Sequence, residues 1–313
     1  MRVAFNSFPT ALTSQLAALT AKQNRLQNQA ATGKRFSQLE DDPSAMRQVL
    51  DWQTQDSQIA QYRKNIASLQ TDATSSYTAI SKLENLSSRA GDIATLADGT
   101  RSPEELKAYA TEVTQLIQQG VQYMNSTGQG GYLFGGTQTA QPPYVVATDA
   151  NGNVTGVTYQ GNDSVPEAEI AAGATVSVQV PGANTSGSGP GGVVTDSRNG
   201  ADFFNHLISL QNHLLAGNTA AISSQDHPAL MKDEENITSQ ITNNGLIQSH
   251  LSTADTVASA QSLSVKQMVS QASDADLAET LTQLSATQTA YQAALQSGAK
   301  LLSSSQTLLN YLT

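Results

Sequence analysis

The sequence predicts a mainly α-helical fold with a β-rich insertion in the middle of the chain. Proline-free tracts with helical spacing of apolar residues lie on both sides, and both ends carry narrow apolar stripes. Residues 120–200 hold 16 of the 22 glycines and five of the nine prolines, together with short β-branched runs. We therefore expect a long antiparallel helical bundle or coiled coil formed by both termini, with a small β domain in the middle.

The C-terminal stripe shows the clearest periodicity in the chain. Its apolar residues recur at alternating steps of four and three, and Gln288, Gly298 and Ser305 fill the remaining positions. Such a repeat is typical of a left-handed coiled coil, whose seam requires a second helix. The seam residues are Leu277, Leu281, Leu284, Tyr291, Leu295, Leu302, Leu309 and Leu312.

The N-terminal segment offers that second helix. The same alternation appears at Leu12, Leu16, Leu19 and Leu26, so we expect the two ends to pair. Few side chains would be buried for the length of chain that must be ordered, and ordering costs conformational entropy at every residue. We therefore expect neighbouring copies to complete the ends, which couples folding to polymerisation. The alternative is an ordinary bundle whose end helices pack on the core.

Between the ends, capping residues predict where the helices begin. Asp42-Pro43 suits the start of a helix that runs without proline to Leu96. Ser102-Pro103-Glu104-Glu105 is a capping box that begins a helix ending near Met124. Helical spacing resumes from Asp202 to Gly217. It continues from residue 226 to the end, with a weak point at 271–276.

The glycine-rich middle of the chain is expected to form short strands. Asn151-Gly152 lies between two β-branched runs and predicts a hairpin turn. Residues 184–192 are rich in serine and glycine, so we expect this segment to be mobile. The predicted domains are residues 1–40 with 274–313 for terminal assembly, 41–130 with 200–273 for the helical core, and 131–199 for the outer β insertion.

Composition narrows the classes of partner. The net charge is −10 with a pI near 4.7, which argues against nucleic acid and anionic membranes. The chain has no cysteine, which excludes disulfides and thiolate metal sites. No apolar run is long enough to span a bilayer, and Met1–Thr10 does not resemble a cleaved signal.

The sequence contains no combination of residues that is typical of a catalytic site. His206 and His213 are seven residues apart with no carboxylate at ligand spacing, which favours surface histidines over a metal site. Residues 130–136 are glycine-rich but lack the lysine of a phosphate loop. Asp41-Asp42 and the pair Asp274 and Asp276 lie beside helix starts, where capping is expected. We expect no enzyme activity, cofactor or metal.

Several short blocks lie within the first 145 and the last 110 residues of the chain. They are Met1-Arg2-Val3, Thr32-Gly33-Lys34-Arg35, Asp41-Asp42-Pro43, Tyr132-Leu133-Phe134-Gly135-Gly136 leading to Pro142-Pro143-Tyr144, Ala290-Tyr291-Gln292-Ala293, and Leu308-Leu309-Asn310-Tyr311-Leu312. Together these blocks resemble the flagellin family, in particular its branch of hook–filament junction proteins. Flagellins more usually carry Asp-Asp-Ala-Ala where this chain has Asp-Asp-Pro.

This resemblance implies a structural role outside the cell, in an adaptor ring between hook and filament. Export would proceed unfolded through the flagellar type III apparatus. The implied partners are further copies of the chain, hook-associated protein 1, flagellin and a cytoplasmic chaperone that shields the C-terminal seam.

Two other roles remain open. One is flagellin itself, the bulk filament subunit. The other, more remote, is a surface adhesin or carbohydrate-binding module in the β insertion. A convergent aromatic and acidic site would support the adhesin, but Tyr132, Phe134, Tyr144 and Tyr159 are scattered in the sequence.

Overall fold

The computed structural model describes residues 7–36, 38 and 40–312, and the side chains of 10–36, 38 and 40–300. The block Met1-Arg2-Val3 lies outside these residues. The chain divides into two compact units, Met1–Gln58 with Gln261–Thr313 and Ile59–Ala260. We call them the terminal unit and the central unit.

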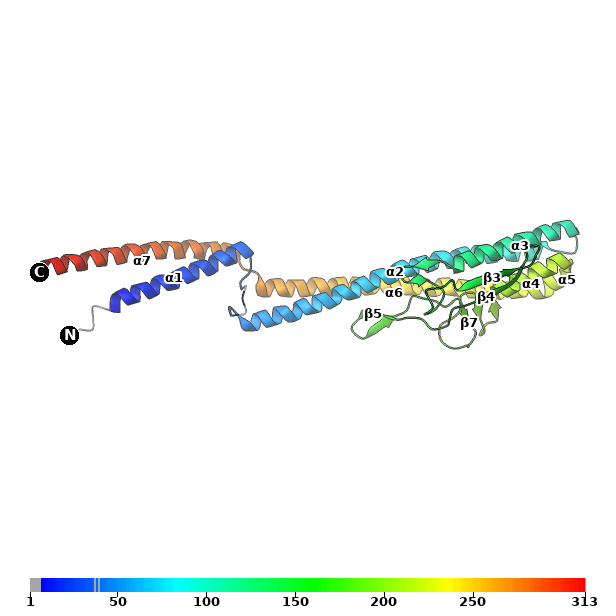
Figure 1. Ribbon diagram of the computed structural model, residues 1–313, viewed down its shortest axis with the longest axis horizontal. Coiled ribbons are helices and arrows are strands. Elements are labelled where there is room, and N and C mark those ends of the chain that lie inside the picture. The colour runs from blue at the N-terminus through cyan, green and yellow to red at the C-terminus, as the bar shows by residue number, and fades with distance from the viewer. Residues whose placement is uncertain (1–6, 37, 39, 313) are drawn as a thin grey trace. The chain divides into compact units, whose positions relative to one another are not determined.

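Helices make up most of the fold, which confirms the predicted class (Figure 1). The helix that starts after Asp42 and the helix that starts after Ser102 begin and end where the sequence predicts. The helices are α1 (Ser7–Thr32), α2 (Pro43–Leu96), α3 (Pro103–Met124), α4 (Phe203–Ala216), the short α5 (Thr219–Ala221), a π-helical turn η1 (Ile222–Asp226), α6 (His227–Ser273) and α7 (Leu277–Leu312).

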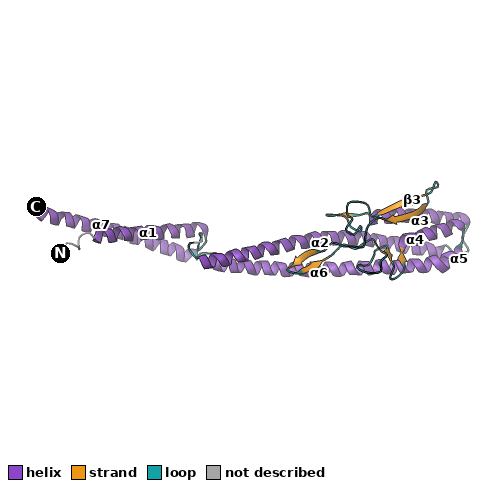
Figure 2. Cartoon of the chain, turned by 60° about the horizontal axis from the view of Figure 1, so that its bottom comes forward, coloured by secondary structure: helices purple, strands orange, loops and turns teal. Residues whose placement is uncertain are grey.

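Short strands form the insertion between α3 and α4, as predicted (Figure 2). Three antiparallel hairpins pair β1 with β2, β3 with β4, and β5 with β6. A fourth sheet has the order β7-β8-β9, with β7 parallel and β9 antiparallel to β8. The strands are β1 (Thr127–Gly128), β2 (Gly131–Tyr132), β3 (Tyr144–Thr148), β4 (Val154–Tyr159), β5 (Ala168–Ala171), β6 (Ala174–Val176), β7 (Ala183–Asn184), β8 (Thr195–Asp196) and β9 (Ala201–Asp202).

Local capping explains why the helices begin and end where they do. The Ser102 side chain accepts from the Glu105 amide, and the Glu105 side chain accepts from the Ser102 amide, so the predicted capping box is formed. Asp42 Oδ1 accepts from the Ala45 amide at 3.0 Å. Gly217 ends α4 with φ 64°, a left-handed conformation that favours glycine.

The core of the central unit lies where α2, α3 and α4 meet the insertion. Large side chains such as Leu83, Ile117, Phe134 and Phe203 are fully buried there. Gly120 lets α3 approach closely, because a Cβ at this position would lie 3.0 Å from Phe204 Cε1 of α4. This core holds the β3–β4 hairpin against α4.

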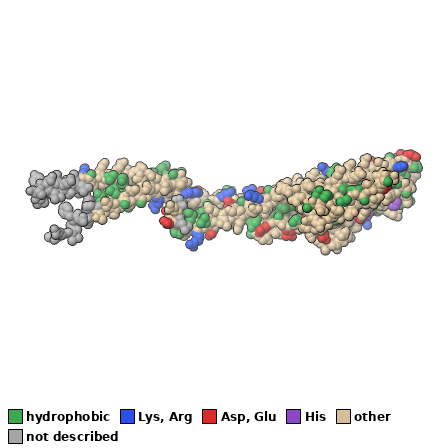
Figure 3. Space-filling view, in the orientation of Figure 1, with side chains coloured by type: hydrophobic (Ala, Val, Ile, Leu, Met, Phe, Trp, Pro, Cys, Tyr) green, Lys and Arg blue, Asp and Glu red, His purple; other side chains and the backbone are tan. Residues whose placement is uncertain are grey.

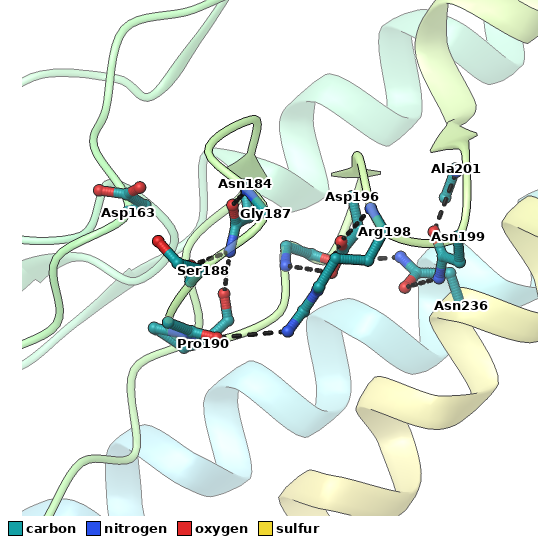
Figure 4. Close-up of polar contacts among 12 residues, drawn as sticks. Asp163, Asn184, Gly187, Ser188, Pro190, Asp196, Arg198, Asn199, Ala201 and Asn236 are labelled. Atoms are coloured by element: carbon teal, nitrogen blue, oxygen red, sulfur yellow. Dashed lines mark hydrogen bonds and ion pairs between the residues drawn. The ribbon is translucent and has the colours of Figure 1, made fainter.

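The segment expected to be mobile is instead closed by hydrogen bonds, which corrects that prediction (Figure 4). The Asn184 side chain is buried and donates through Nδ2 to the carbonyl oxygens of Ser188 and Pro190, both at 2.7 Å. Its Oδ1 accepts from the Gly187 amide at 3.0 Å. One buried amide side chain therefore pairs two carbonyl oxygens and one amide of the loop backbone.

In the terminal unit, a junction of two strand-like segments separates α6 from α7. The Arg35 amide donates to the Ser273 carbonyl at 2.7 Å, and the Ala275 amide donates to the Gly33 carbonyl at 2.8 Å. Asp276 Oδ1 then caps α7 by accepting from the Ala278 and Glu279 amides. The weak point predicted at 271–276 is therefore a true helix boundary.

Candidate assembly surface

The terminal unit is built on an antiparallel pair of helices, α1 and α7 (Figures 1 and 2). Near one end of the pair, Lys34 Nζ lies 2.6 Å from Asp274 Oδ1. Toward the other end, Leu12 packs directly on Gly298. The two helices run in opposite directions between these contacts, as the matched stripes predict.

One narrow face of α1 packs on α7. Within residues 10–28, every position is exposed except five that recur at steps of four and three. Leu26 is 2 % exposed and the other four are half-buried. The five positions are Leu12, Leu16, Leu19, Gln23 and Leu26.

The face of α7 that receives α1 carries small side chains. Within residues 277–300, the protected positions also recur at steps of four and three. The buried hydroxyls of Thr280 and Thr287 donate to the carbonyls four residues earlier in the chain, both at 2.7 Å, so burying them leaves no unpaired donor. The protected positions are Thr280, Leu284, Thr287, Tyr291, Ala294 and Gly298.

This face differs in part from the predicted seam. Leu284 and Tyr291 lie in the contact with α1, but Leu277, Leu281 and Leu295 are 48 %, 55 % and 46 % exposed, so the prediction that they pack against α1 is wrong. The side chains of Leu302, Leu309 and Leu312 lie outside the described residues.

Small side chains explain the difference. The α1 leucines can approach the α7 backbone closely over threonine, alanine and glycine, and closer approach gives more van der Waals contact per residue. A face made of the large leucines would keep the two helix axes further apart. The surface of α7 that contacts α1 is therefore shifted by one residue around the helix relative to the predicted seam. The leucines remain on the adjacent face.

The exposed leucines form a surface that we call the leucine face, consisting of Leu277, Leu281 and Leu295. Residues 277–299 contain a single charged residue, Glu279. Apolar and uncharged polar side chains dominate the visible face of the α1–α7 pair in the space-filling view (Figure 3). An apolar stripe on a nearly uncharged helix suits contact with another helix rather than with a charged ligand.

The two predicted surface histidines have buried carboxylate partners that the sequence did not reveal. His206 Nδ1 lies 2.7 Å from Asp233 Oδ2, and His213 Nδ1 lies 2.7 Å from Asp226 Oδ2. Each histidine is on α4, while Asp226 ends η1 and Asp233 lies on α6. Partners on a different helix leave no spacing signal in the sequence.

Among the residues that the structure describes, no group of histidines and carboxylates is arranged to hold a metal ion. Within the same residues, no helix is long and apolar enough to cross a membrane.

The aromatic residues of the insertion, which are scattered in the sequence, are not all scattered in the structure, and this corrects a third expectation. The ring centroids of Tyr144 and Tyr159 lie 5.1 Å apart. Phe134 is fully buried in the core, and Tyr132 lies half-buried on β2. Two of the four aromatic residues therefore converge, because the β3–β4 hairpin pairs Tyr144 with Tyr159.

Comparison with solved structures finds the same fold in flagellar proteins. A protein assigned as a flagellar hook-associated protein from Vibrio parahaemolyticus has a TM-score of 0.63 and 22% identity, over 75% of this chain and 100% of that chain. FlgL from Xanthomonas campestris has a TM-score of 0.56 and 17% identity, over 69% and 98%. The flagellar junction protein FlgL from Legionella pneumophila has a TM-score of 0.50 and 13% identity, over 74% and 99%. At these identities the likeness establishes a shared fold.

Comparison with models of protein families shows which family the sequence belongs to. No curated protein sequence matches this chain. The N-terminal helical region of bacterial flagellin matches residues 5–139, and the C-terminal helical region matches residues 231–312. The two matches cover both ends of the chain and together more than half of its length, so the chain belongs to the flagellin family.

Proposed function

We propose that this chain is a structural, non-catalytic part of the bacterial flagellum, an adaptor that forms a ring between hook and filament. The observation that carries the proposal is the leucine face of α7. Three large apolar side chains lie exposed along one helix, next to the face already occupied by α1. Exposed apolar stripes of this kind are costly in water and mark surfaces that another molecule covers.

A helix of a further copy of the chain suits this surface best. The spacing of the leucine face continues the heptad repeat in sequence through Leu302, Leu309 and Leu312, so a helix could dock along its whole length. Hook-associated protein 1 would cover the ring on one side and flagellin on the other. The domains predicted from the sequence give residues 1–40 and 274–313 to assembly, 41–130 and 200–273 to the helical core, and 131–199 to an outer domain.

The route to the flagellum belongs to the same proposal. The chain would leave the cell unfolded through the flagellar type III apparatus and function outside it. Before export, a cytoplasmic chaperone would hold the C-terminal helix, because a free leucine face would otherwise associate too early. The similarity in fold to hook-associated proteins and to a flagellar junction protein supports the adaptor over the bulk filament subunit.

The test replaces the leucine face in the source bacterium. Leu277→Ser, Leu281→Ser and Leu295→Ser are combined in one variant that replaces the chromosomal copy. The matched control combines Leu246→Ser and Leu263→Ser, which are 66 % and 60 % exposed on α6. We expect the first variant to be exported but to leave hooks without filaments and to release flagellin into the medium, while the control swims normally.

Two results would contradict the proposal. Normal filaments on cells with the triple variant would show that the leucine face is not an assembly surface. Filaments built from this chain along their whole length, seen by labelling with an antibody against it, would identify it as the bulk subunit instead.

A further inference from the structure

The sequence contains three Asn-Gly pairs, at Asn151-Gly152, Asn199-Gly200 and Asn244-Gly245. This dipeptide can react with itself in water, because the backbone nitrogen of the second residue lies within reach of the side-chain carbonyl carbon of the asparagine. Glycine has no Cβ to obstruct that approach. The surroundings of each pair in the folded chain therefore decide which of the three reacts.

Asn151-Gly152 forms the tip of the β3–β4 hairpin, and both residues are exposed. Among the residues that the structure describes, the side-chain amide of Asn151 has no hydrogen-bond partner. A Cβ on Gly152 would meet no atom within 4 Å, so the side chain has room to turn. The Gly152 amide donates to the Asp149 carbonyl oxygen at 3.1 Å, but this contact lies within the exposed turn, where local opening is easy.

Asn199-Gly200 is also exposed, but its asparagine side chain is held at both polar atoms (Figure 4). Asn199 Nδ2 donates to Asn236 Oδ1 at 2.9 Å, and Asn199 Oδ1 accepts from the Ala201 amide at 3.0 Å. Asn236 is 3 % exposed on α6, so it is a fixed partner. The side-chain carbon of Asn199 cannot turn toward the Gly200 nitrogen unless both hydrogen bonds break.

Asn244-Gly245 lies inside α6, and Asn244 is fully buried. Asn244 Oδ1 accepts from Gln248 Nε2 at 2.6 Å. Helical backbone angles direct the nitrogen of the next residue away from the asparagine side chain, so this pair cannot react while the helix is intact.

We propose that Asn151 is a site of spontaneous modification, at which the folded chain is converted to aspartate and isoaspartate. The carrying observation is the contrast between three identical dipeptides, of which only Asn151-Gly152 combines an exposed turn with an unrestrained asparagine side chain. The site lies in the central unit and does not depend on the proposed adaptor role.

The reaction needs only water. The Gly152 nitrogen loses its proton to the solvent and attacks Cγ of Asn151, so that a C–N bond forms, the Cγ–Nδ2 bond breaks and ammonia leaves with a proton from the solvent. The product is a cyclic imide. Water then opens this ring at one of its two carbonyl carbons, which gives aspartate when Cγ is attacked and isoaspartate when the backbone carbonyl carbon is attacked. No oxidation or reduction takes place.

Isoaspartate would change the hairpin, because it adds one carbon to the backbone at the tip. The turn is now closed by Asp149 Oδ1, which accepts from the amides of Asn151 and Asn153 at 2.9 and 2.8 Å. A longer backbone cannot keep both amides in place. The pairing of Thr148 with Val154 at the end of the hairpin should therefore loosen in the modified chain.

The experiment follows the purified full chain during incubation in mildly alkaline buffer, by peptide mass spectrometry and by enzymatic methylation of isoaspartate. In the folded chain Asn151 should convert first, and Asn199 about tenfold or more slowly, because two hydrogen bonds must break. Asn244 should remain unchanged. In urea the three pairs should convert at similar rates. Conversion of Asn199 or Asn244 as fast as Asn151 in the folded chain, or of Asn151 only in urea, overturns the proposal.

Two variants identify the site. Asn151→Gln keeps an amide at the tip but requires a larger ring, which forms much more slowly, so isoaspartate and the more acidic form of the chain should no longer accumulate. The melting temperature should stay the same. Asn243→Gln is the matched control, because Asn243 is exposed on α6 and is not followed by glycine. If Asn151→Gln accumulates isoaspartate as fast as the control, the assignment to Asn151 is wrong.

Discussion

At the scale of single residues, Gly298 determines how closely the terminal helices approach. A Cβ at this position would overlap Leu12 Cδ2. The sequence places Gly298 in the heptad seam but gives no sign that a leucine of α1 lies over it. The contact depends on the register between α1 and α7, which the matched stripes do not fix, and it joins residues nearly 290 positions apart.

We predict that Gly298→Val weakens the α1–α7 pair. The added branches must displace Leu12, and overpacking of this kind costs about 1–3 kcal/mol. The measurement is amide hydrogen exchange over residues 10–26 in assembled rings, where neighbouring copies hold the pair, and exchange should speed up in the variant. Gly245→Val on α6 is the matched control, because a Cβ there meets nothing within 4 Å. Equal exchange in both variants would show that the close approach is not important.

Other residue-level features were predicted from the sequence because they are local. The Ser102 capping box, the Asp42 cap and the turn at Gly152, with φ 84°, each depend on residues within four positions of one another. The partners of His206 and the convergence of Tyr144 with Tyr159 were missed. Those contacts depend on how helices and strands pair, and the spacing of residues along one sequence does not reveal that pairing.

At the scale of elements, His206 and Asp233 join α4 to α6. Hydrogen bonding to Asp233 raises the pKa of His206 above its ordinary value, and the charges of Asp202 and Asp226 act in the same direction. Burial raises the pKa of Asp233 as well. His206 therefore stabilises the fold fully below its unfolded pKa, and this contribution is lost as the pH rises through its folded value. The raised pKa of Asp233 acts the other way, because the buried carboxyl costs stability once it ionises.

We therefore predict a pH-dependent contribution from this pair. The natural chain should be more stable than His206→Gln near pH 6, and the difference should shrink by about pH 9, where the imidazole has lost its proton. Urea denaturation at both pH values measures this difference in the free energy of unfolding. Asp233→Asn, which removes the charge and keeps the shape, should lose the same pH-dependent part. A difference that is constant with pH would show that only the neutral hydrogen bond matters.

The α7 helix shows what periodicity can and cannot predict. The heptad repeat correctly places an antiparallel partner helix against α7. It does not say which of two neighbouring faces meets that partner, because leucines mark one face and small residues the other. The choice in favour of Thr280 and Thr287 comes from packing distance, which depends on both helices at once.

At the scale of the whole molecule, the two units bury very different amounts of apolar surface. The central unit contains a large cluster of buried aliphatic and aromatic side chains. Among the described residues of the terminal unit, the contact between α1 and α7 relies on one buried leucine, on half-buried leucines and on threonine, alanine and glycine. Local opening is easiest where few apolar contacts must be broken.

Limited proteolysis of the purified monomer should therefore remove roughly the first 40 and last 40 residues and leave a resistant core. Mass spectrometry of a time course with a protease of broad specificity measures this. Assembled rings should resist cleavage at the same positions, because neighbouring copies would cover them. Uniform resistance of the monomer at both ends would contradict the prediction, as would slow exchange of the amides of residues 277–312 in dilute solution.

The two adjacent faces of α7 allow an assembly to grow while α1 and α7 stay paired. Since Leu284 and Tyr291 face α1 while Leu281 and Leu295 remain outside that contact, a third helix can be added without separating the first two. Under the proposed role, each newly arrived subunit would complete its own α1–α7 pair as it docks and would present the same unoccupied face to the next. Elongation would then need no exchange of segments between subunits, and the geometry of the first contact would be copied at every later step.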